Sequence, residues 1–181
     1  MRDGCWGCRS DAYARAMSSI VPAPADGYAG DLTPEQTWEL LTADPDAVLV
    51  DVRTRGEWEH IGVPDTAGAT GRPAVFTQWV LDNGTPNPAF LTDLDRGLAQ
   101  AGAGVGAKLV FLCRSGQRSV AAARIATAAG LAPSYNVLEG FEGAPGSAGR
   151  RDVEGWKVAG LPWRRTFADG APAGEALGAP E

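Results

Sequence analysis

The sequence has little histidine, little cysteine and no long apolar run, and each shortage argues against a class of protein. One of its 181 residues is a histidine, His60, which argues against a His-rich metal site and leaves any Cys-His mechanism dependent on that residue. Three cysteines are too few for a disulfide scaffold. No apolar run is as long as a membrane span, and residues 1–25 carry no signal-like hydrophobic segment. We therefore expect a cytoplasmic protein that does not enter a membrane.

Positive charge is also in short supply. Asp and Glu number 22 against 16 Lys and Arg, which gives a formal net charge of -6 at pH 7. Such an acidic chain does not favour nucleic acid or an anionic membrane surface as a partner. The length suits one domain with a sizeable core, and no internal repeat divides the chain into two modules.

What the sequence does contain is a strand, a cysteine loop and a helix in immediate succession. Leu109–Leu112 is apolar and rich in branched residues, as a buried strand is, and it ends at Cys113. After a short polar loop, the small-residue run Val120–Ala129 predicts a helix that ends at Gly130. Cys113 is therefore expected at the carboxyl end of a strand, facing the amino end of the next helix.

This position makes Cys113 the candidate nucleophile. Free backbone N–H groups and the positive end of the helix dipole meet at a helix N-terminus and favour an anion there. A thiolate is such an anion, and it is the reactive form of cysteine. Arg114 and Arg118 would add positive charge to the same loop, and Gly116 would let the backbone curl around the sulfur.

The rest of the chain alternates predicted strands and helices. Thr33 and Gln36 match a capping box with Pro34 at the first helical position, so a helix is expected to begin there. The other predicted elements are a strand over Ala47–Val52, a helical turn over Arg55–Glu59, a helix over Pro88–Gln100 with Phe90, Leu91, Leu94 and Leu98 on one face, a strand over Lys108–Leu112, a helix over Ser119–Ala129 and a strand over Tyr135–Leu138. Val75–Leu81 is ambiguous between strand and helix. This order predicts an α/β layered fold whose central sheet is mainly parallel.

Both ends of the chain differ in composition from the part between them. Residues 1–27 are a predicted flexible N-terminal extension, which ends in the Pro- and Ala-rich segment Val21–Gly27. Residues 28–165 form the predicted domain. Residues 166–181 are mostly Ala, Gly, Pro and Glu, and we expect them to be a disordered tail.

Four segments, taken in order, resemble a single-domain rhodanese: Asp51–Arg53, Glu57–Trp58, Cys113–Ser119 and Trp156–Pro162. The resemblance covers roughly residues 28–165, and the cysteine loop is its strongest element. It implies a rhodanese-like three-layer fold, in which helices flank a mainly parallel central sheet.

The resemblance also implies sulfurtransferase chemistry that needs no cofactor and no metal. In this family a thiolate at the position of Cys113 attacks the outer sulfur of a small anionic donor such as thiosulfate, and sulfite leaves. The resulting persulfide passes its terminal sulfur to cyanide, a thiol or a protein acceptor. Where many members have a paired glycine after the fifth strand, this chain has Leu138–Gly143, which includes Phe141, and then a polar insertion. The natural donor and acceptor therefore stay open.

The same resemblance suggests roles for residues around the cysteine. The predicted substrate-binding residues are Arg114, Ser115, Gly116, Gln117 and Arg118. Their backbone amides would hold the persulfide, and the two arginines would attract an anionic donor. We expect Asp51 or Glu57 to pair with Arg118 and so support the loop. Arg53 and Phe141 are candidate rim residues of the pocket.

Other interpretations stay open. A rhodanese module can serve only in binding or as a sulfur carrier, although such modules commonly lack the cysteine that this chain keeps. Phosphatases and arsenate reductases of related fold have a longer loop between cysteine and arginine than the four residues that separate Cys113 from Arg118. The shorter loop favours a single sulfur atom over a tetrahedral phosphate. Cys5 and Cys8 are either incidental thiols of the extension or acceptors of the Cys113 persulfide.

Overall fold

The computed structural model describes residues 20–131, 133–165 and 167. Its elements are, in chain order, β1 (Gly30–Leu32), α2 (Pro34–Ala43), β2 (Ala47–Asp51), α3 (Arg55–Ile61), β3 (Val63–Pro64), α4 (Ala67–Thr70), β4 (Val75–Phe76), α5 (Phe90–Gln100), β5 (Lys108–Leu112), α6 (Gln117–Ala128), β6 (Ser134–Val137) and β7 (Trp163–Arg164). Most of the predicted extension and tail, with Cys5 and Cys8, lies outside the described residues. Of the extension, Ile20 is buried and Ala23 forms an antiparallel bridge with Asp31.

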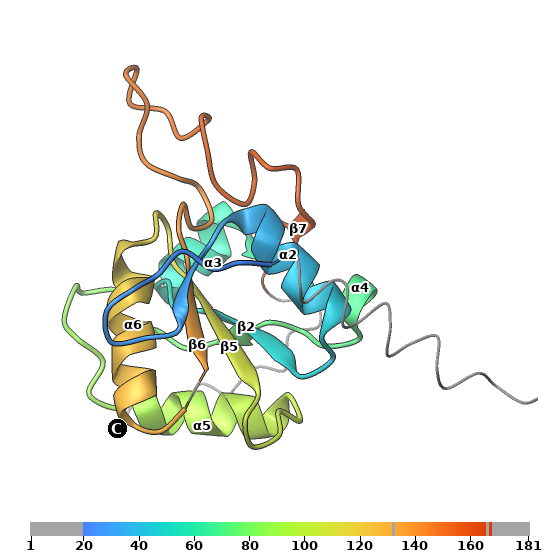
Figure 1. Ribbon diagram of the computed structural model, residues 1–181. Coiled ribbons are helices and arrows are strands. Elements are labelled where there is room, and N and C mark those ends of the chain that lie inside the picture. The colour runs from blue at the N-terminus through green and yellow to red at the C-terminus, as the bar shows by residue number, and fades with distance from the viewer. Residues whose placement is uncertain (1–19, 132, 166, 168–181) are drawn as a thin grey trace, which may run out of the picture.

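Five parallel strands form the central sheet, in the order β1-β6-β5-β2-β4. A second, antiparallel pair joins β3 to β7, so the chain returns near its end to the segment that follows α3. Helices α5 and α6 pack on one face of the sheet and α2 packs on the other (Figure 1). This is the three-layer α/β arrangement with a mainly parallel sheet that the sequence predicts.

The central strand β5 is buried on both faces, and its register aims the residue that follows it. Leu109 and Phe111 pack with residues of α5 and α6, whereas Val110 and Leu112 pack on the side of α2. Successive side chains of a strand point to opposite faces of the sheet. The alternation continues into Cys113, which belongs to the same cluster as Leu109 and Phe111. Cys113 therefore lies on the α6 side of the sheet.

Two capping boxes fix the starts of α2 and α3. The Thr33 hydroxyl accepts from the Gln36 N–H at 3.2 Å, and the Gln36 side chain accepts from the Thr33 N–H at 3.0 Å, as predicted. Thr54 and Glu57 form the same reciprocal pair at the start of α3. Because this second box satisfies N–H groups of the first turn, the predicted helical turn is a helix that continues to Ile61.

Several predicted boundaries and faces differ from the structure. On α5, Phe90, Leu94 and Leu98 are buried, but Leu91 is 39% exposed because it is rotated about 100° from Phe90 around the helix. The ambiguous segment Val75–Leu81 contains only the two-residue strand β4. Smaller shifts place the start of α6 at Gln117 and the bounds of β6 at Ser134–Val137.

A buried ion pair lies at the carboxyl end of β2. Arg53 Nη2 donates to Asp51 Oδ2 at 2.6 Å, and Arg53 Nε donates to both carboxylate oxygens at 3.0 and 3.1 Å. The guanidinium also donates to the Gly62 carbonyl at 2.9 Å and lies 4.0 Å from the centre of the Phe141 ring. The expectation that Arg53 and Phe141 are rim residues is therefore wrong, since both are fully buried. Pairing with Asp51 is what lets a charged side chain enter the core.

We predict that Arg53→Met lowers the free energy of unfolding by about 3–5 kcal/mol, because the Asp51 carboxylate would stay buried without its partner. For a domain of this size that corresponds to a fall in melting temperature of roughly 6–20 °C, measured by circular dichroism. The control is Arg55→Met, which removes an exposed ion pair with Glu59 that should contribute less than about 1 kcal/mol. Small and equal losses in both variants would contradict the prediction.

Candidate active site

Cys113 stands where β5 ends and the loop to α6 begins. It follows Leu112, the last residue of the strand, and only 1% of its surface is exposed. The hydroxyl of Ser119, in the first turn of α6, donates a hydrogen bond to Cys113 Sγ at 3.2 Å. The sulfur therefore faces the amino end of α6, as the sequence predicts.

The carbonyls at the start of the loop are bound by the segment that follows β6, which rises in orange from this end of the molecule in Figure 1. The Phe141 N–H donates to the Cys113 carbonyl at 2.8 Å. The N–H groups of Glu142 and Gly143 donate to the Arg114 carbonyl at 3.0 and 3.2 Å. These bonds fix the orientation of the first peptide groups of the loop.

The N–H groups of the loop are left without backbone acceptors. Among the described residues, no backbone carbonyl accepts a hydrogen bond from the N–H of Ser115, Gly116 or Gln117. The first N–H groups of a helix have no partner within the helix, and they bind anions well. The loop that starts at Cys113 therefore offers a set of free donors at the positive end of the α6 dipole.

Two glycines allow the loop to contact the segment after β6 directly. Gly116 has a φ of +84° and Gly140 a φ of +64°, both in the left-handed region that favours glycine. A Cβ atom on Gly116 would lie 1.8 Å from the Leu138 carbonyl oxygen, and one on Gly140 would lie 2.5 Å from the Cys113 carbonyl oxygen. Neither position has room for a side chain.

Arg118 is held by Glu57 through two parallel hydrogen bonds. Its Nη1 and Nη2 each donate to a different carboxylate oxygen of Glu57 at 2.7 Å. Burial alone would raise the pKa of Glu57, but the hydrogen bonds from Arg118 and the Thr54 N–H, with the charges of Arg118 and Arg53, lower it below its ordinary value. Burial alone would lower the pKa of Arg118, but the hydrogen bond and charge of Glu57, with the charges of Cys113 and Asp51, raise it. Both groups are therefore charged at neutral pH.

Arg114 is also paired with a carboxylate, through a single hydrogen bond to Glu142 in the segment after β6. Its Nε donates to Glu142 Oε2 at 2.8 Å. The Arg114 side chain is 39% exposed, whereas that of Glu142 is only 12% exposed. Each arginine of the cysteine loop thus has a carboxylate partner.

The structure brings together only part of the predicted supporting set. The expected pairing of Glu57 with Arg118 is present, whereas Asp51 binds Arg53 instead. Of the predicted substrate-binding residues, Gly116 is buried, Arg114, Ser115 and Arg118 are half-buried, and Gln117 is exposed. Two residues at the site are missing from the sequence prediction, Ser119 and Glu142. A signal for Ser119 exists, because it lies in the first helical turn beside the cysteine loop.

Among the described residues, no three His, Cys, Asp or Glu side chains are grouped so that they could hold a metal ion. None of the described helices has the length and apolar character that crossing a bilayer requires.

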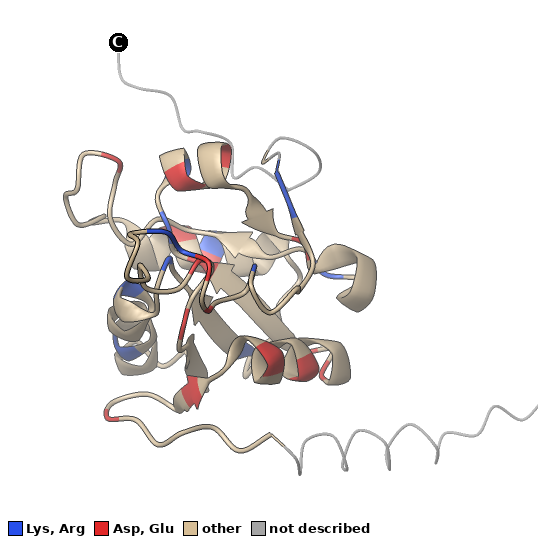
Figure 2. Ribbon diagram, turned by 90° about the horizontal axis from the view of Figure 1, so that it is seen from above, with Lys and Arg blue, Asp and Glu red and all other residues tan. Residues whose placement is uncertain are grey.

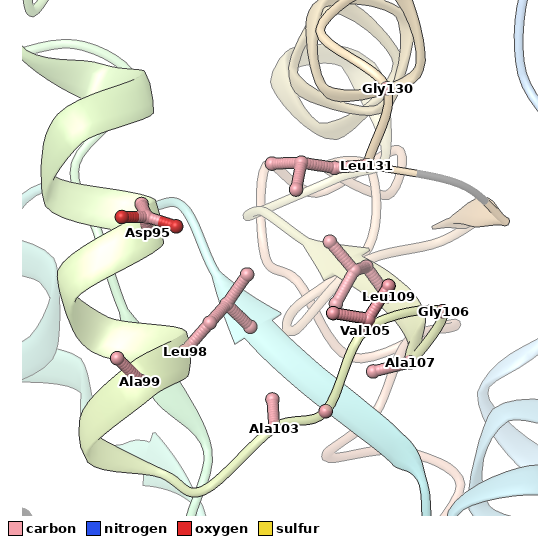
Figure 3. A pocket seen from close by; sticks show the side chains of 11 residues that line it. Asp95, Leu98, Ala99, Ala103, Val105, Gly106, Ala107, Leu109, Gly130 and Leu131 are labelled. Atoms are coloured by element: carbon pink, nitrogen blue, oxygen red, sulfur yellow. The ribbon is translucent and has the colours of Figure 1, made fainter.

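A pocket of about 210 Å³ lies between the end of α5, the loop before β5 and the residues that follow α6 (Figure 3). Leu98, Leu109 and Leu131 line it, with Asp95 at one side. Leu109 is four residues before Cys113 on β5, which corresponds to about 13 Å along a strand. The pocket therefore borders the opposite end of β5 and does not belong to the cysteine site.

Comparisons with known proteins agree with this geometry. The sequence model of the rhodanese-like domain matches residues 33–144. The crystal structure of Rv0390 from M. tuberculosis is 48% identical, covers 76% of this chain and 98% of that chain, and superposes with a TM-score of 0.69. The uncharacterized protein RC0915 of Rickettsia conorii and the uncharacterized RP600 homolog of Rickettsia rickettsii are each 33% identical over 129 residues, which is 71% of this chain and 92% of theirs.

We predict that Gly116→Ala destabilises the protein more than Gly130→Ala does. Both glycines have nearly the same φ, +84° and +83°, so both variants bear the cost of a left-handed alanine, about 1–2 kcal/mol. A Cβ on Gly130 meets nothing within 4 Å, whereas one on Gly116 meets the Leu138 carbonyl. Chemical denaturation should therefore show a further loss of about 1–3 kcal/mol for Gly116→Ala. Equal losses would show that the loop can move away from Leu138 without cost.

We predict that Glu57→Gln lowers the free energy of unfolding at neutral pH by about 1–3 kcal/mol, because the amide nitrogen cannot accept one of the two hydrogen bonds from Arg118 and the other loses its charged acceptor. The folded pKa of Glu57 is lowered, so its stabilisation is complete above the ordinary value of 4.5 and is lost as the pH falls through the folded value. The difference between wild type and variant should therefore shrink in acid. Glu59→Gln, which removes an exposed carboxylate of the same helix, is the control and should change little at any pH. A Glu57→Gln difference that stays constant with pH would contradict the assignment.

Proposed function

The chain belongs to the rhodanese-like domain family, and we propose that it is a sulfurtransferase that carries sulfur as a persulfide on Cys113. The single observation that supports this most directly is the hydrogen bond from Ser119 to Cys113 Sγ, made beside the free N–H groups of the loop. A persulfide on Cys113 would have a hydroxyl donor at its inner sulfur and the N–H groups of a helix N-terminus around its outer sulfur.

The proposed reaction has two steps and consumes no oxidant or reductant. In the first, the Cys113 thiolate attacks the outer sulfur of a sulfane donor such as thiosulfate. A new S–S bond forms, the S–S bond of the donor breaks, and sulfite leaves with the bonding electron pair. In the second, cyanide, a thiol or a protein acceptor attacks the outer sulfur of the persulfide, and Cys113 leaves as a thiolate.

The loop N–H groups and the Ser119 hydroxyl act on different sulfur atoms of the proposed persulfide. The N–H groups of residues 115–117 would hold the negative charge of the outer sulfur. The Ser119 hydroxyl donates to the inner sulfur, which is the leaving group of the second step. The cysteine must stay reduced for this chemistry, and we keep the cytoplasm as the proposed location.

The position of Arg118 supports sulfur transfer over phosphatase chemistry. An arginine that recognises a phosphate does so through two parallel N–H donors. In this chain both η nitrogens of Arg118 already donate to Glu57. The guanidinium therefore acts as a support of the loop, and the four residues that separate Cys113 from Arg118 favour a single sulfur atom over a tetrahedral phosphate.

The test uses a variant in which Cys113 is the only cysteine, made by Cys5→Ser and Cys8→Ser. We predict that this variant gains the mass of one sulfur atom when it is incubated with thiosulfate or with cysteine hydropersulfide, as measured by intact-protein mass spectrometry. Cyanide should remove the added sulfur and yield thiocyanate. The further change Cys113→Ser should abolish both the gain of mass and the thiocyanate.

Two outcomes would count against the proposal. If the folded and reduced variant gains no sulfur from either donor, it is not a sulfurtransferase, and a binding module is favoured. If the persulfide forms but reacts with acceptors no faster than free cysteine hydropersulfide, the protein is a sulfur carrier without significant turnover.

A further inference from the structure

The segment after β6 places the nearly buried carboxylate of Glu142 against Arg114, the residue that follows Cys113. Glu142 is bound to Arg114 twice: its N–H donates to the Arg114 carbonyl at 3.0 Å, and its carboxylate accepts from Arg114 Nε at 2.8 Å. Glu142 is the more buried partner, which indicates that the pair is held from the side of this segment.

This carboxylate removes the last uncompensated side-chain charge of the loop. Arg118 is balanced by Glu57 and Arg114 by Glu142. Charged residues of both signs lie intermixed at this end of the domain, as Figure 2 shows from above. The helix N-terminus adds a positive potential equivalent to about half an elementary charge.

Thiosulfate and alkyl hydropersulfides, two classes of sulfane donor, differ in how much positive charge they need at the site. A thiolate and a thiosulfate dianion bring three negative charges together before sulfite leaves. A thiolate and an alkyl hydropersulfide bring fewer, because this donor carries at most one negative charge on its sulfur atoms and reacts in its protonated form, RSSH: the thiolate attacks the terminal sulfur, the S–S bond of the donor breaks, and RS⁻ leaves. A loop with two balanced arginines favours the second encounter over the first.

We propose that Glu142 is a specificity-determining residue, which restrains the use of dianionic thiosulfate and leaves the site better suited to alkyl hydropersulfides, which bring less negative charge. The inference rests on the proposed sulfurtransferase function. Glu142 acts through Arg114, and it need not touch the substrate.

The charge of Glu142 can be removed without removing its structural bonds. Glutamine at this position keeps the backbone N–H and an oxygen that accepts from Arg114 Nε. The insertion also has supports of its own, since the Gly143 carbonyl accepts from Arg151 and Glu154 accepts from the Ala144 N–H at 3.0 Å. Glu142→Gln is therefore expected to fold as the wild type does.

The experiment measures the rate of persulfide formation on Cys113, by rapid quenching and intact mass, in the background that lacks Cys5 and Cys8. We predict that Glu142→Gln reacts with thiosulfate about three- to tenfold faster, whereas its rate with cysteine hydropersulfide changes less than about twofold. Added salt should slow the thiosulfate reaction of Glu142→Gln more steeply than that of the wild type. Glu154→Gln, which removes a carboxylate of the same insertion that has no arginine partner, should match the wild type with both donors.

The outcomes separate this inference from the proposed function. If persulfide forms in both proteins and Glu142→Gln changes neither rate, or changes both rates equally, Glu142 only supports the loop and the inference is wrong. If neither protein forms persulfide with either donor, the sulfurtransferase proposal fails and the inference fails with it. Glu142→Ala is the second variant: a structural role predicts that it slows both donors, whereas the charge mechanism predicts a faster thiosulfate reaction.

Discussion

The site depends on a contact between two backbone segments with no side chain between them. The loop after β5 lies directly on the segment after β6, at Gly116 on one side and Gly140 on the other. This closeness lets backbone N–H groups of the segment after β6 donate to the carbonyls of Cys113 and Arg114. Once these carbonyls are bound on the outside, the N–H groups that follow are the ones left free. The proposed anion site is thus a consequence of packing, and the side chains of the loop are secondary to it.

The buried ion pair of Arg53 and Asp51 supports this contact. The ring of Phe141 lies on the Arg53 guanidinium, and the N–H of the same residue binds the Cys113 carbonyl. Arg53 is in turn fixed by Asp51 at the end of β2. A pair of this kind contributes little net stability compared with an apolar pair, but it has one geometry. It therefore connects the ends of β2 and β5 to the insertion in a defined arrangement, which a more permissive apolar contact would not ensure.

The sequence predicts well what depends on neighbours along the chain. The strand before Cys113, the helix after it and the capping box of α2 are local patterns, and the structure contains each of them. The burial of Arg53 and Phe141 cannot be predicted in this way, because nothing in their local sequence indicates it. Their burial depends on the Gly62 carbonyl and on each other, 88 positions apart in the numbering. The sequence predicts that either Asp51 or Glu57 pairs with Arg118 but does not decide between them. Asp51 ends β2 and Glu57 follows it closely in α3, and only the first turn of α3 directs Glu57 toward the loop.

Charge next to a cysteine is therefore a poor guide to what the cysteine binds. From the sequence, Arg114 and Arg118 look like two positive groups available to an anionic substrate. In the folded chain each is matched by a carboxylate that arrives from a different element, Glu57 from α3 and Glu142 from the segment after β6. The backbone donors of the loop add a positive potential equivalent to about half an elementary charge, which suits one negative charge better than three. A persulfide anion carries one charge, so the loop suits the proposed intermediate better than it suits a dianionic donor. In our proposal Glu142 increases this preference, because it balances the charge of Arg114.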